Sequence, residues 1–246
     1  MNEASEMTNV TLDTGEAMPA YCARPPAAPR GAVLIIVDMF GLRAFYEDLA
    51  RRVAAAGYVC LAPDYFFRQG RLAQITLPAA FARREHLDEN RTLVDLSRTL
   101  DWLRRDAQAT GRIGSIGFCM GGTLALDLAA RRGDLATVCY YAFPADDGSA
   151  SQLRAPAPLA LVDRISGPIL GFWGDQDQNV GLPNVHRLVG ELTARRISVD
   201  HVIYPAVAHG FLADANFRPD HPAYPAASDS WRRALSFLGQ HLVGAA

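Results

Sequence analysis

The chain has 246 residues, half of them hydrophobic, and a formal net charge of −2. A charge so close to zero gives no reason to expect a nucleic-acid partner or an acidic membrane surface, and no apolar run reaches the roughly 18 residues that cross a bilayer. The first ten residues, MNEASEMTNV, include acidic side chains and lack an apolar core, so they do not resemble a signal peptide. We therefore expect a cytoplasmic protein that does not enter the membrane.

The cysteines support the same location. Cys22, Cys60, Cys119 and Cys139 are scattered, with no CxxC pair and no cysteine–histidine spacing of the kind that binds zinc. We expect reduced thiols and no metal site.

Short apolar runs recur along the chain and are rich in Val, Ile and aromatic residues. Runs of this length that are apolar on both faces are typical of parallel strands covered on both sides by helices. The sequence predicts such strands within residues 32–40, 58–64, 112–118, 136–143, 168–174 and 199–205.

Segments with helical spacing alternate with these runs. Leucines recur at helical spacing in 91–105, the segment 121–133 ends at a glycine typical of a helix C-terminus, and 228–242 begins with Ser and Asp before an apolar stripe. Strands that alternate with helices indicate βαβ units. We predict an α/β fold with a doubly wound, mostly parallel sheet and helices on both faces, formed by residues 1–246 as a single domain.

The stretch SIGFCMGG, residues 115–122, has the strand–turn–helix pattern known as a nucleophile elbow, with cysteine as the central residue. A tight turn of this kind needs small neighbours, which Gly117, Gly121 and Gly122 provide. The helix that follows directs its N-terminus at the sulfur of Cys119 and favours the thiolate, and the Met120 N–H is free to bind an oxyanion. The alternative is a buried cysteine in a glycine-rich packing turn.

A cysteine nucleophile needs a base and a group that orients the base. His209 lies in AHGF, a loop after a predicted strand, whereas the other five histidines fall in helix-like segments, a strand or a proline-rich loop. Asp175 and Asp177 follow the strand at 168–174. The order Cys, Asp, His along the chain is the order that α/β-hydrolases use for nucleophile, acid and base.

Taken together, these motifs resemble the dienelactone hydrolase family, a cysteine-dependent branch of the α/β-hydrolases. The resemblance extends from about residue 30 to the C-terminal helix and depends on DMFGLR, APDYF, GFCMGG, GDQDQNV and AHGF in this order. It implies Cys119 as nucleophile, His209 as base and Asp177 as acid, with Asp175 as the alternative. It also implies Phe40 and Met120 as oxyanion donors, and it allows a monomer or a small homo-oligomer.

Two positions depart from the family's pattern. Asp38 occupies the place of a glutamate that is implicated in activating the thiol, and it is one methylene shorter. The family's substrate-binding arginine, four residues after the catalytic histidine, is replaced here by an alanine. Arg218, in NFRPD, is the candidate to replace it. Arg83 and Arg84 are the candidates for a second substrate-binding arginine of the family, and the alternative for this pair is a solvated helix face.

The predicted activity is hydrolysis of a small ester or of a lactone similar to dienelactone, through a thioester on Cys119 and without a metal or organic cofactor. The alternatives are a broader carboxylesterase or thioesterase and, in a different class, a non-catalytic relative that binds a small molecule. In such a relative, Cys119 would react with alkylating reagents no faster than an ordinary thiol.

Overall fold

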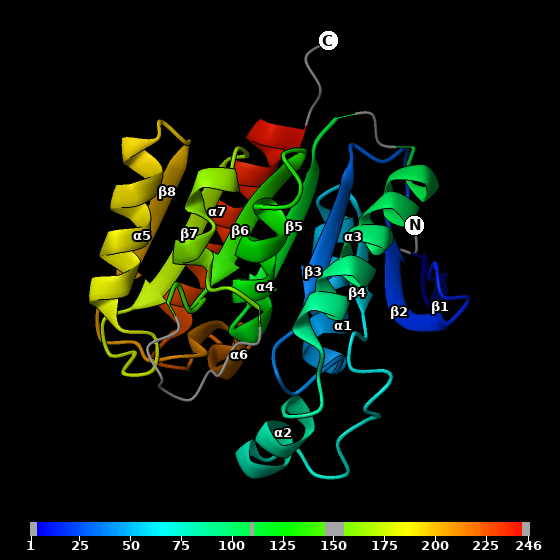
Figure 1. Ribbon diagram of the computed structural model, residues 1–246, viewed down its shortest axis with the longest axis horizontal. Helices are drawn as coiled ribbons and strands as arrows, with labels where there is room; N and C mark the ends of the chain where they lie inside the picture. Colours follow the sequence, from blue (N-terminus) through cyan, green and yellow to red (C-terminus); the bar gives the residue numbers. More distant parts are fainter. Residues whose placement is uncertain (1–3, 109–110, 146–154, 243–246) are drawn as a thin grey trace.

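Eight strands lie side by side in one sheet, in the order β1-β2-β4-β3-β5-β6-β7-β8 (Figure 1). The computed structural model describes residues 4–108, 111–145 and 155–242. The strands are β1 (Ala4–Thr11), β2 (Ala17–Arg24), β3 (Ala32–Ile36), β4 (Val59–Pro63), β5 (Ile113–Phe118), β6 (Leu135–Tyr140), β7 (Ile169–Gly174) and β8 (Val199–Tyr204). From β4 to β8 all neighbours are parallel, which confirms the doubly wound sheet.

The two N-terminal strands form an antiparallel hairpin at one edge of the sheet, and β2 joins β4 in antiparallel orientation. The sequence analysis did not predict β1 and β2. β1 is an edge strand with largely exposed side chains, so it lacks the continuous apolar run that marks the buried strands.

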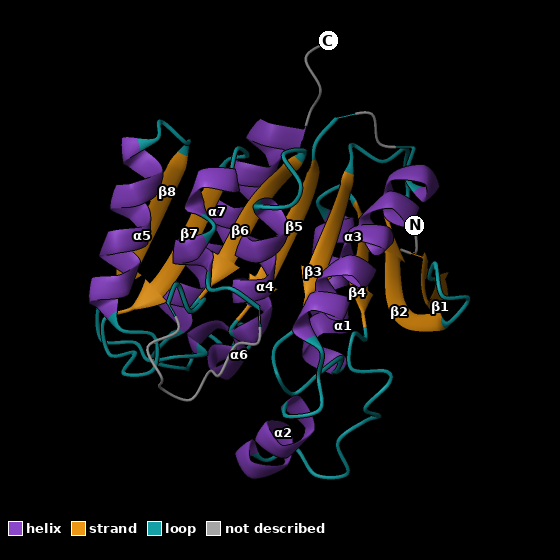
Figure 2. Ribbon diagram, viewed as in Figure 1, coloured by secondary structure: helices purple, strands orange, loops and turns teal. Residues whose placement is uncertain are grey.

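Helices cover both faces of the sheet (Figures 1 and 2). α3 (Glu89–Asp106), α4 (Met120–Ala129) and α5 (Leu182–Ala194) lie on one face, and α1 (Ala44–Ala55) and α7 (Tyr224–Leu242) lie on the other. The short helix α6 (Phe211–Ala215) follows β8, and two 3-10 turns span Pro158–Ala160 and Val162–Arg164. No helix in the described ranges is both long and apolar enough to cross a membrane.

Two helix ends differ from the prediction. α4 ends at Ala129, short of the glycine at 133. α7 begins at Tyr224 rather than at Ser228, because a proline in the first turn of a helix costs no hydrogen bond and the following alanines continue it.

The remaining helix, α2 (Leu77–Arg84), lies between β4 and α3 in the chain. It projects below the sheet in Figure 1, beyond the ends at which the parallel strands finish. Open α/β sheets bind their ligands at this edge. The placement of α2 therefore makes it a candidate wall of a binding site.

Glycines allow β5 and α4 to pack closely around the turn that joins them. A Cβ at Gly117 would lie 2.1 Å from the Gly121 carbonyl oxygen, and a Cβ at Gly121 would lie 2.2 Å from the Val37 carbonyl oxygen. Both distances are too short for any real contact, and both involve backbone atoms, which cannot move aside as a side chain can. Any larger residue at these positions must displace α4.

We expect Gly121→Ala to lower the free energy of unfolding by roughly 3 kcal/mol or more, because of this overlap. The matched control is Gly190→Ala in the exposed face of α5, where a Cβ meets nothing within 4 Å. The control should raise the free energy of unfolding by about 0.5–1 kcal/mol, since alanine favours helix. Urea denaturation of both variants measures the difference, and equal effects would contradict the packing argument.

Candidate active site

Cys119 occupies a strained turn between β5 and α4. Its backbone has φ 55° and ψ −122°, a conformation that residues other than glycine rarely adopt. Its N–H donates to the Tyr140 carbonyl oxygen, and its own carbonyl accepts from the first turn of α4. The side chain is therefore held at the N-terminus of α4, which is the positive end of the helix dipole.

The loops after β7 and β8 bring an acid and a base together. Asp177 Oδ2 lies 2.7 Å from His209 Nδ1. The other oxygen of Asp177 accepts hydrogen bonds from the N–H groups of Asn179 and Val180, at 2.9 and 3.2 Å, and its side chain is fully buried. Asp175, the alternative, is exposed and accepts from the Ala206 N–H instead. The geometry pairs His209 with Asp177.

His209 is held in a state that favours its protonated form. Burial by itself would lower the pKa of His209, but the hydrogen bonds to Asp177 and Cys119, together with their charges, outweigh it and raise the pKa to about 10. The Cys119 side chain is thus a neighbour that acts on the imidazole together with Asp177.

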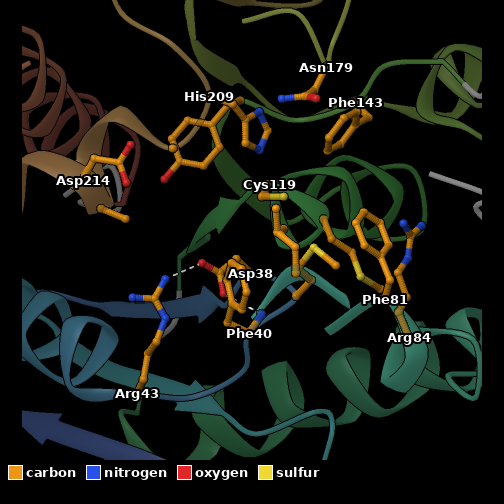
Figure 3. Close-up of a pocket in the computed structure, with 16 residues that line it drawn as sticks. Asp38, Phe40, Arg43, Phe81, Arg84, Cys119, Phe143, Asn179, His209 and Asp214 are labelled. Carbon is orange, nitrogen blue, oxygen red and sulfur yellow. Dashed lines mark hydrogen bonds and ion pairs between the residues drawn. The ribbon is translucent and has the colours of Figure 1, made fainter. Parts of the chain in front are cut away.

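A tight turn at residues 38–41, after β3, forms the side of the site opposite His209 (Figure 3). The Gly41 N–H donates to the Asp38 carbonyl at 3.0 Å, which closes the turn. The Phe40 N–H donates to Asp38 Oδ1 at 2.9 Å, and Arg43 forms an ion pair with Asp38 Oδ2. Both carboxylate oxygens of Asp38 are therefore engaged away from the thiol in the described structure.

Two backbone N–H groups near the sulfur make no hydrogen bond among the described residues. One belongs to Met120, the first residue of α4, and the other to Met39 in the turn. The Phe40 N–H, predicted as the second oxyanion donor, is occupied by Asp38. Met39, which the sequence reading passed over, is thus the neighbouring donor that has no partner.

These residues surround a pocket of about 520 Å³. Figure 3 shows Cys119 near its centre, with Arg43 and Arg84 on opposite sides. Its lining comes from the segments that follow the carboxyl ends of the strands, from α2, and from α6 and the loop before it. The lining residues are Asp38, Met39, Phe40, Arg43, Leu77, Phe81, Arg84, Cys119, Met120, Tyr141, Phe143, Asn179, His209, Gly210, Ala213 and Asp214.

Of the three arginines predicted to bind the substrate, one lines the pocket and two do not. Arg84 lines the pocket and forms an ion pair with Glu89 at 3.2 Å. Arg83 does not line it, because its guanidinium is buried and donates to two backbone carbonyl groups. Arg218 does not line it either, because it donates to the carbonyl groups of Asp214 and Ala215. Arg43, which does line the pocket, was not identified as a candidate, although it stands at the end of the DMFGLR motif.

Sequence reasoning also missed the aromatic wall next to His209. The rings of Tyr141 and Phe143 lie 4.9 and 5.4 Å from the imidazole ring, centre to centre. Tyr141 has a positive φ of 41°, which turns the chain directly after β6. A signal was present, because both residues lie at the carboxyl end of the apolar run at 136–143, and ligands bind at this end of the strands in such folds.

Charges of both signs line the pocket. Burial raises the pKa of Asp214, although the nearby charges of His221, His209 and Arg43 lower it in part. Asp214 lies one residue beyond the alanine that replaces the expected arginine. Within the described ranges, no group of three or more His, Cys, Asp or Glu side chains could hold a metal ion.

The other three cysteines differ from Cys119 in their surroundings. Cys22, Cys60 and Cys139 are buried, whereas Cys119 is partly exposed to the pocket. Burial raises the pKa of each of the three, to about 12 for Cys139. These thiols are therefore part of the core.

Comparison with known proteins agrees with this geometry. The model of the dienelactone hydrolase family matches residues 18–242. A carboxymethylenebutenolidase of Rhodococcus opacus is 35% identical over 215 residues, which cover 87% of this chain and 83% of that protein. A protein of Escherichia coli K12 assigned the same name is 31% identical, covering 92% of this chain and 84% of its own length.

A crystal structure of a protein from Klebsiella pneumoniae assigned as a dienelactone hydrolase superposes with a TM-score of 0.87. It is 29% identical in sequence, and the match covers 98% of this chain and 100% of that one. The sheet order, the strand–turn–helix arrangement around Cys119 and the family match lead to the same assignment. The chain belongs to the dienelactone hydrolase family, whose members are α/β-hydrolases that cleave carboxylic esters.

Proposed function

We propose that this protein hydrolyses a small ester or lactone through a thioester on Cys119, with His209 as general acid and base and Asp177 as the acid that orients His209. The observation that carries the proposal is that Cys119 and His209 line one pocket, with His209 hydrogen-bonded through Nδ1 to the buried Asp177. A nucleophile, a base and an orienting carboxylate in this relation are the elements of acyl transfer.

In the first step the sulfur of Cys119 attacks the carbonyl carbon of the substrate, and the carbonyl oxygen becomes an oxyanion. When the tetrahedral intermediate collapses, the bond from carbon to the leaving oxygen breaks and His209 gives its proton to that oxygen. The products are a thioester on Cys119 and an alcohol, which in a lactone stays attached to the acyl group.

In the second step neutral His209 takes a proton from water, and the hydroxyl oxygen attacks the thioester carbon. Collapse of this second intermediate releases the carboxylic acid and returns the proton to the Cys119–His209 pair. The two carboxylate oxygens of Asp177, held by His209 and by the loop N–H groups, keep the ring in one orientation throughout.

The oxyanion needs donors that are already in place. The Met120 N–H is one, and the turn at residues 38–41 supplies the other. Within the turn we favour Met39, whose N–H has no partner, over Phe40, whose N–H becomes available only if Asp38 moves. In this arrangement Asp38 stabilises the turn through its hydrogen bond with the Phe40 N–H. For Asp38 to activate the thiol as well, its carboxylate would have to break its contacts with Arg43 and Phe40.

The pocket suits a small acyl group with apolar and polar parts. Leu77, Phe81 and Phe143 supply apolar surface. Arg43 also lines the pocket and pairs with Asp38 through one of its guanidinium nitrogens, Nη2. A cation in this place favours a lactone that carries a carboxylate.

A second candidate is a broader esterase for small uncharged esters. It is favoured by the neutralisation of both pocket arginines, since Arg43 pairs with Asp38 and Arg84 with Glu89. Asp214 adds a carboxyl group where a cation was expected.

The test is to measure kcat/KM for cis- and trans-dienelactone, p-nitrophenyl acetate and an acetyl thioester, with Cys119→Ala as the background. Preference for dienelactone supports the lactonase, and preference for the uncharged esters supports the second candidate. If no substrate is cleaved above the Cys119→Ala background, the proposed function is wrong.

A further inference from the structure

Arg83 ties the projecting helix α2 to the turn that borders the active site. Its Nη2 donates to the Met39 carbonyl at 2.7 Å and its Nη1 donates to the Gly70 carbonyl at 3.1 Å. The side chain is only 8% exposed, and the guanidinium carbon lies 3.9 Å from the centre of the Phe66 ring. Such a buried cation is costly unless its hydrogen bonds are made, which gives these contacts a fixed geometry.

The carbonyl that Arg83 binds belongs to the central peptide of the turn at residues 38–41. A peptide unit is planar, with its C=O and N–H groups pointing in opposite directions. Holding the Met39 carbonyl therefore also fixes the Phe40 N–H, which donates to Asp38 Oδ1 from the other side of the same plane. The peptide is anchored at both ends.

The other peptides of this segment are anchored by different groups. The Asp38 N–H donates to the Tyr46 hydroxyl at 3.1 Å, and the Tyr65 hydroxyl donates to the Val37 carbonyl at 2.8 Å. The Asp38 carbonyl accepts from the Gly41 N–H. Arg83 is thus the only side chain in the described structure that hydrogen-bonds to the carbonyl of the central peptide.

This central peptide is the part of a tight turn that can rotate, since the two common turn types differ mainly in its orientation. Rotation would turn the Met39 carbonyl oxygen toward the Asp38 carboxylate and break the hydrogen bond from the Phe40 N–H to Asp38 Oδ1. The turn would then lose the geometry in which it presents the Met39 N–H, the donor favoured above for the oxyanion. The orientation of this one peptide therefore affects catalysis.

The sequence makes room for the contact at Gly41. A Cβ at Gly41 would lie 3.2 Å from Nη2 and 3.3 Å from Nη1 of Arg83, and Gly41 has φ +83°. A side chain at this position would press on the guanidinium and strain the turn. Gly41 and Arg83 are therefore matched in shape.

We infer that Arg83 is a positioning residue, which holds the Met39–Phe40 peptide and thereby fixes the turn from which the Met39 N–H is presented to the oxyanion. The inference depends on the proposed function, because the oxyanion forms only in acyl transfer. It also links substrate binding to the turn, since Leu77, Phe81 and Arg84 on the same helix α2 line the pocket.

The experiment compares Arg83→Met and Arg83→Lys with wild type in two reactions of Cys119. Hydrolysis of p-nitrophenyl acetate passes through an oxyanion, but alkylation by iodoacetamide does not, because displacement of iodide involves no carbonyl addition. For Arg83→Met we expect kcat for hydrolysis to fall about tenfold to a hundredfold, less than the full loss of one oxyanion donor, while the alkylation rate stays near that of wild type. Arg83→Lys, which retains a cation that can donate to the Met39 carbonyl, should recover much of the loss.

The control is Arg68→Met in the same segment, where the arginine pairs with Glu16 and Asp95 and does not reach the turn. It should lower the melting temperature and leave both reactions intact. The inference is overturned if Arg83→Met keeps the wild-type kcat, if its hydrolysis and alkylation fall together, or if Arg68→Met shows the same selective loss. Failure of wild type to hydrolyse any ester would instead refute the proposed function.

If Arg83→Met does not fold, the rates of hydrolysis and alkylation can be compared in Arg83→Lys alone. A single ammonium cannot hold both carbonyl groups, so we still expect a fall in kcat that exceeds the change in alkylation rate. Equal rates to wild type in both reactions would overturn the inference in this variant too.

Discussion

Cys119→Ala should lower kcat/KM for ester hydrolysis by at least about a thousandfold, because no thioester can form without the sulfur. The effect is expected on the chemical step alone. The side chain is small and partly exposed, so its loss should leave the melting temperature near that of wild type. Steady-state kinetics with p-nitrophenyl acetate, together with thermal unfolding, measure the two quantities.

Cys22→Ala is the matched control, since it removes a thiol that is buried in β2 and remote from the pocket lining. This variant should lose some stability and keep its kcat. If Cys119→Ala retains wild-type hydrolysis, or if Cys22→Ala loses it, Cys119 is not the nucleophile. Mass spectrometry of the wild-type protein, quenched during turnover, should show the acyl group on the peptide that contains Cys119.

Asp177→Asn should lower kcat by about a hundredfold to ten-thousandfold, because an amide can hold His209 in the wrong tautomer and no longer supports the imidazolium. Asp175→Asn, two residues earlier in the same loop, is the control. Asp175 is exposed, and its carboxylate accepts from Gln176 and from the Ala206 N–H rather than from His209, so this variant should retain kcat. The opposite ranking of the two variants would reassign the acid to Asp175.

Asp177→Asn should also change how the free energy of unfolding depends on pH. The pKa of His209 is raised from its usual value of 6.5 to about 10 in the folded protein. The stabilisation from protonated His209 is therefore complete below the unfolded value and is lost as the pH rises through the folded one. The difference in free energy of unfolding between wild type and Asp177→Asn should thus be largest near pH 6 and shrink toward about pH 10. A difference that does not vary with pH would contradict the raised pKa.

Local sequence patterns were sufficient to predict the parts of the fold that are determined by residues close together in the chain. The buried parallel strands have continuous apolar runs, and the elbow needs glycines at fixed distances from Cys119. His209 and Asp177 follow predicted strands, so the parallel sheet itself implies that their loops meet at one edge.

The rest depended on contacts between distant segments, for which the sequence has no local signal. Arg83 and Arg84 are adjacent in α2, yet one is buried against the turn at 38–41 and the other faces the pocket. Helical geometry separates neighbouring side chains by about 100°, but the sequence does not say which of them faces the turn. Arg43 likewise becomes recognisable only when its partner Asp38 is seen.

Because the four cysteines differ in burial, the number of thiols that react with a reagent distinguishes folded from unfolded molecules. In the folded chain, one thiol lies in a pocket and three lie in the core. A thiol reagent in excess should add one label to each folded molecule and four to each unfolded one. The mass of the labelled sample therefore reports the fraction of competent active sites in any preparation, and turnover numbers of variants can be expressed per working molecule.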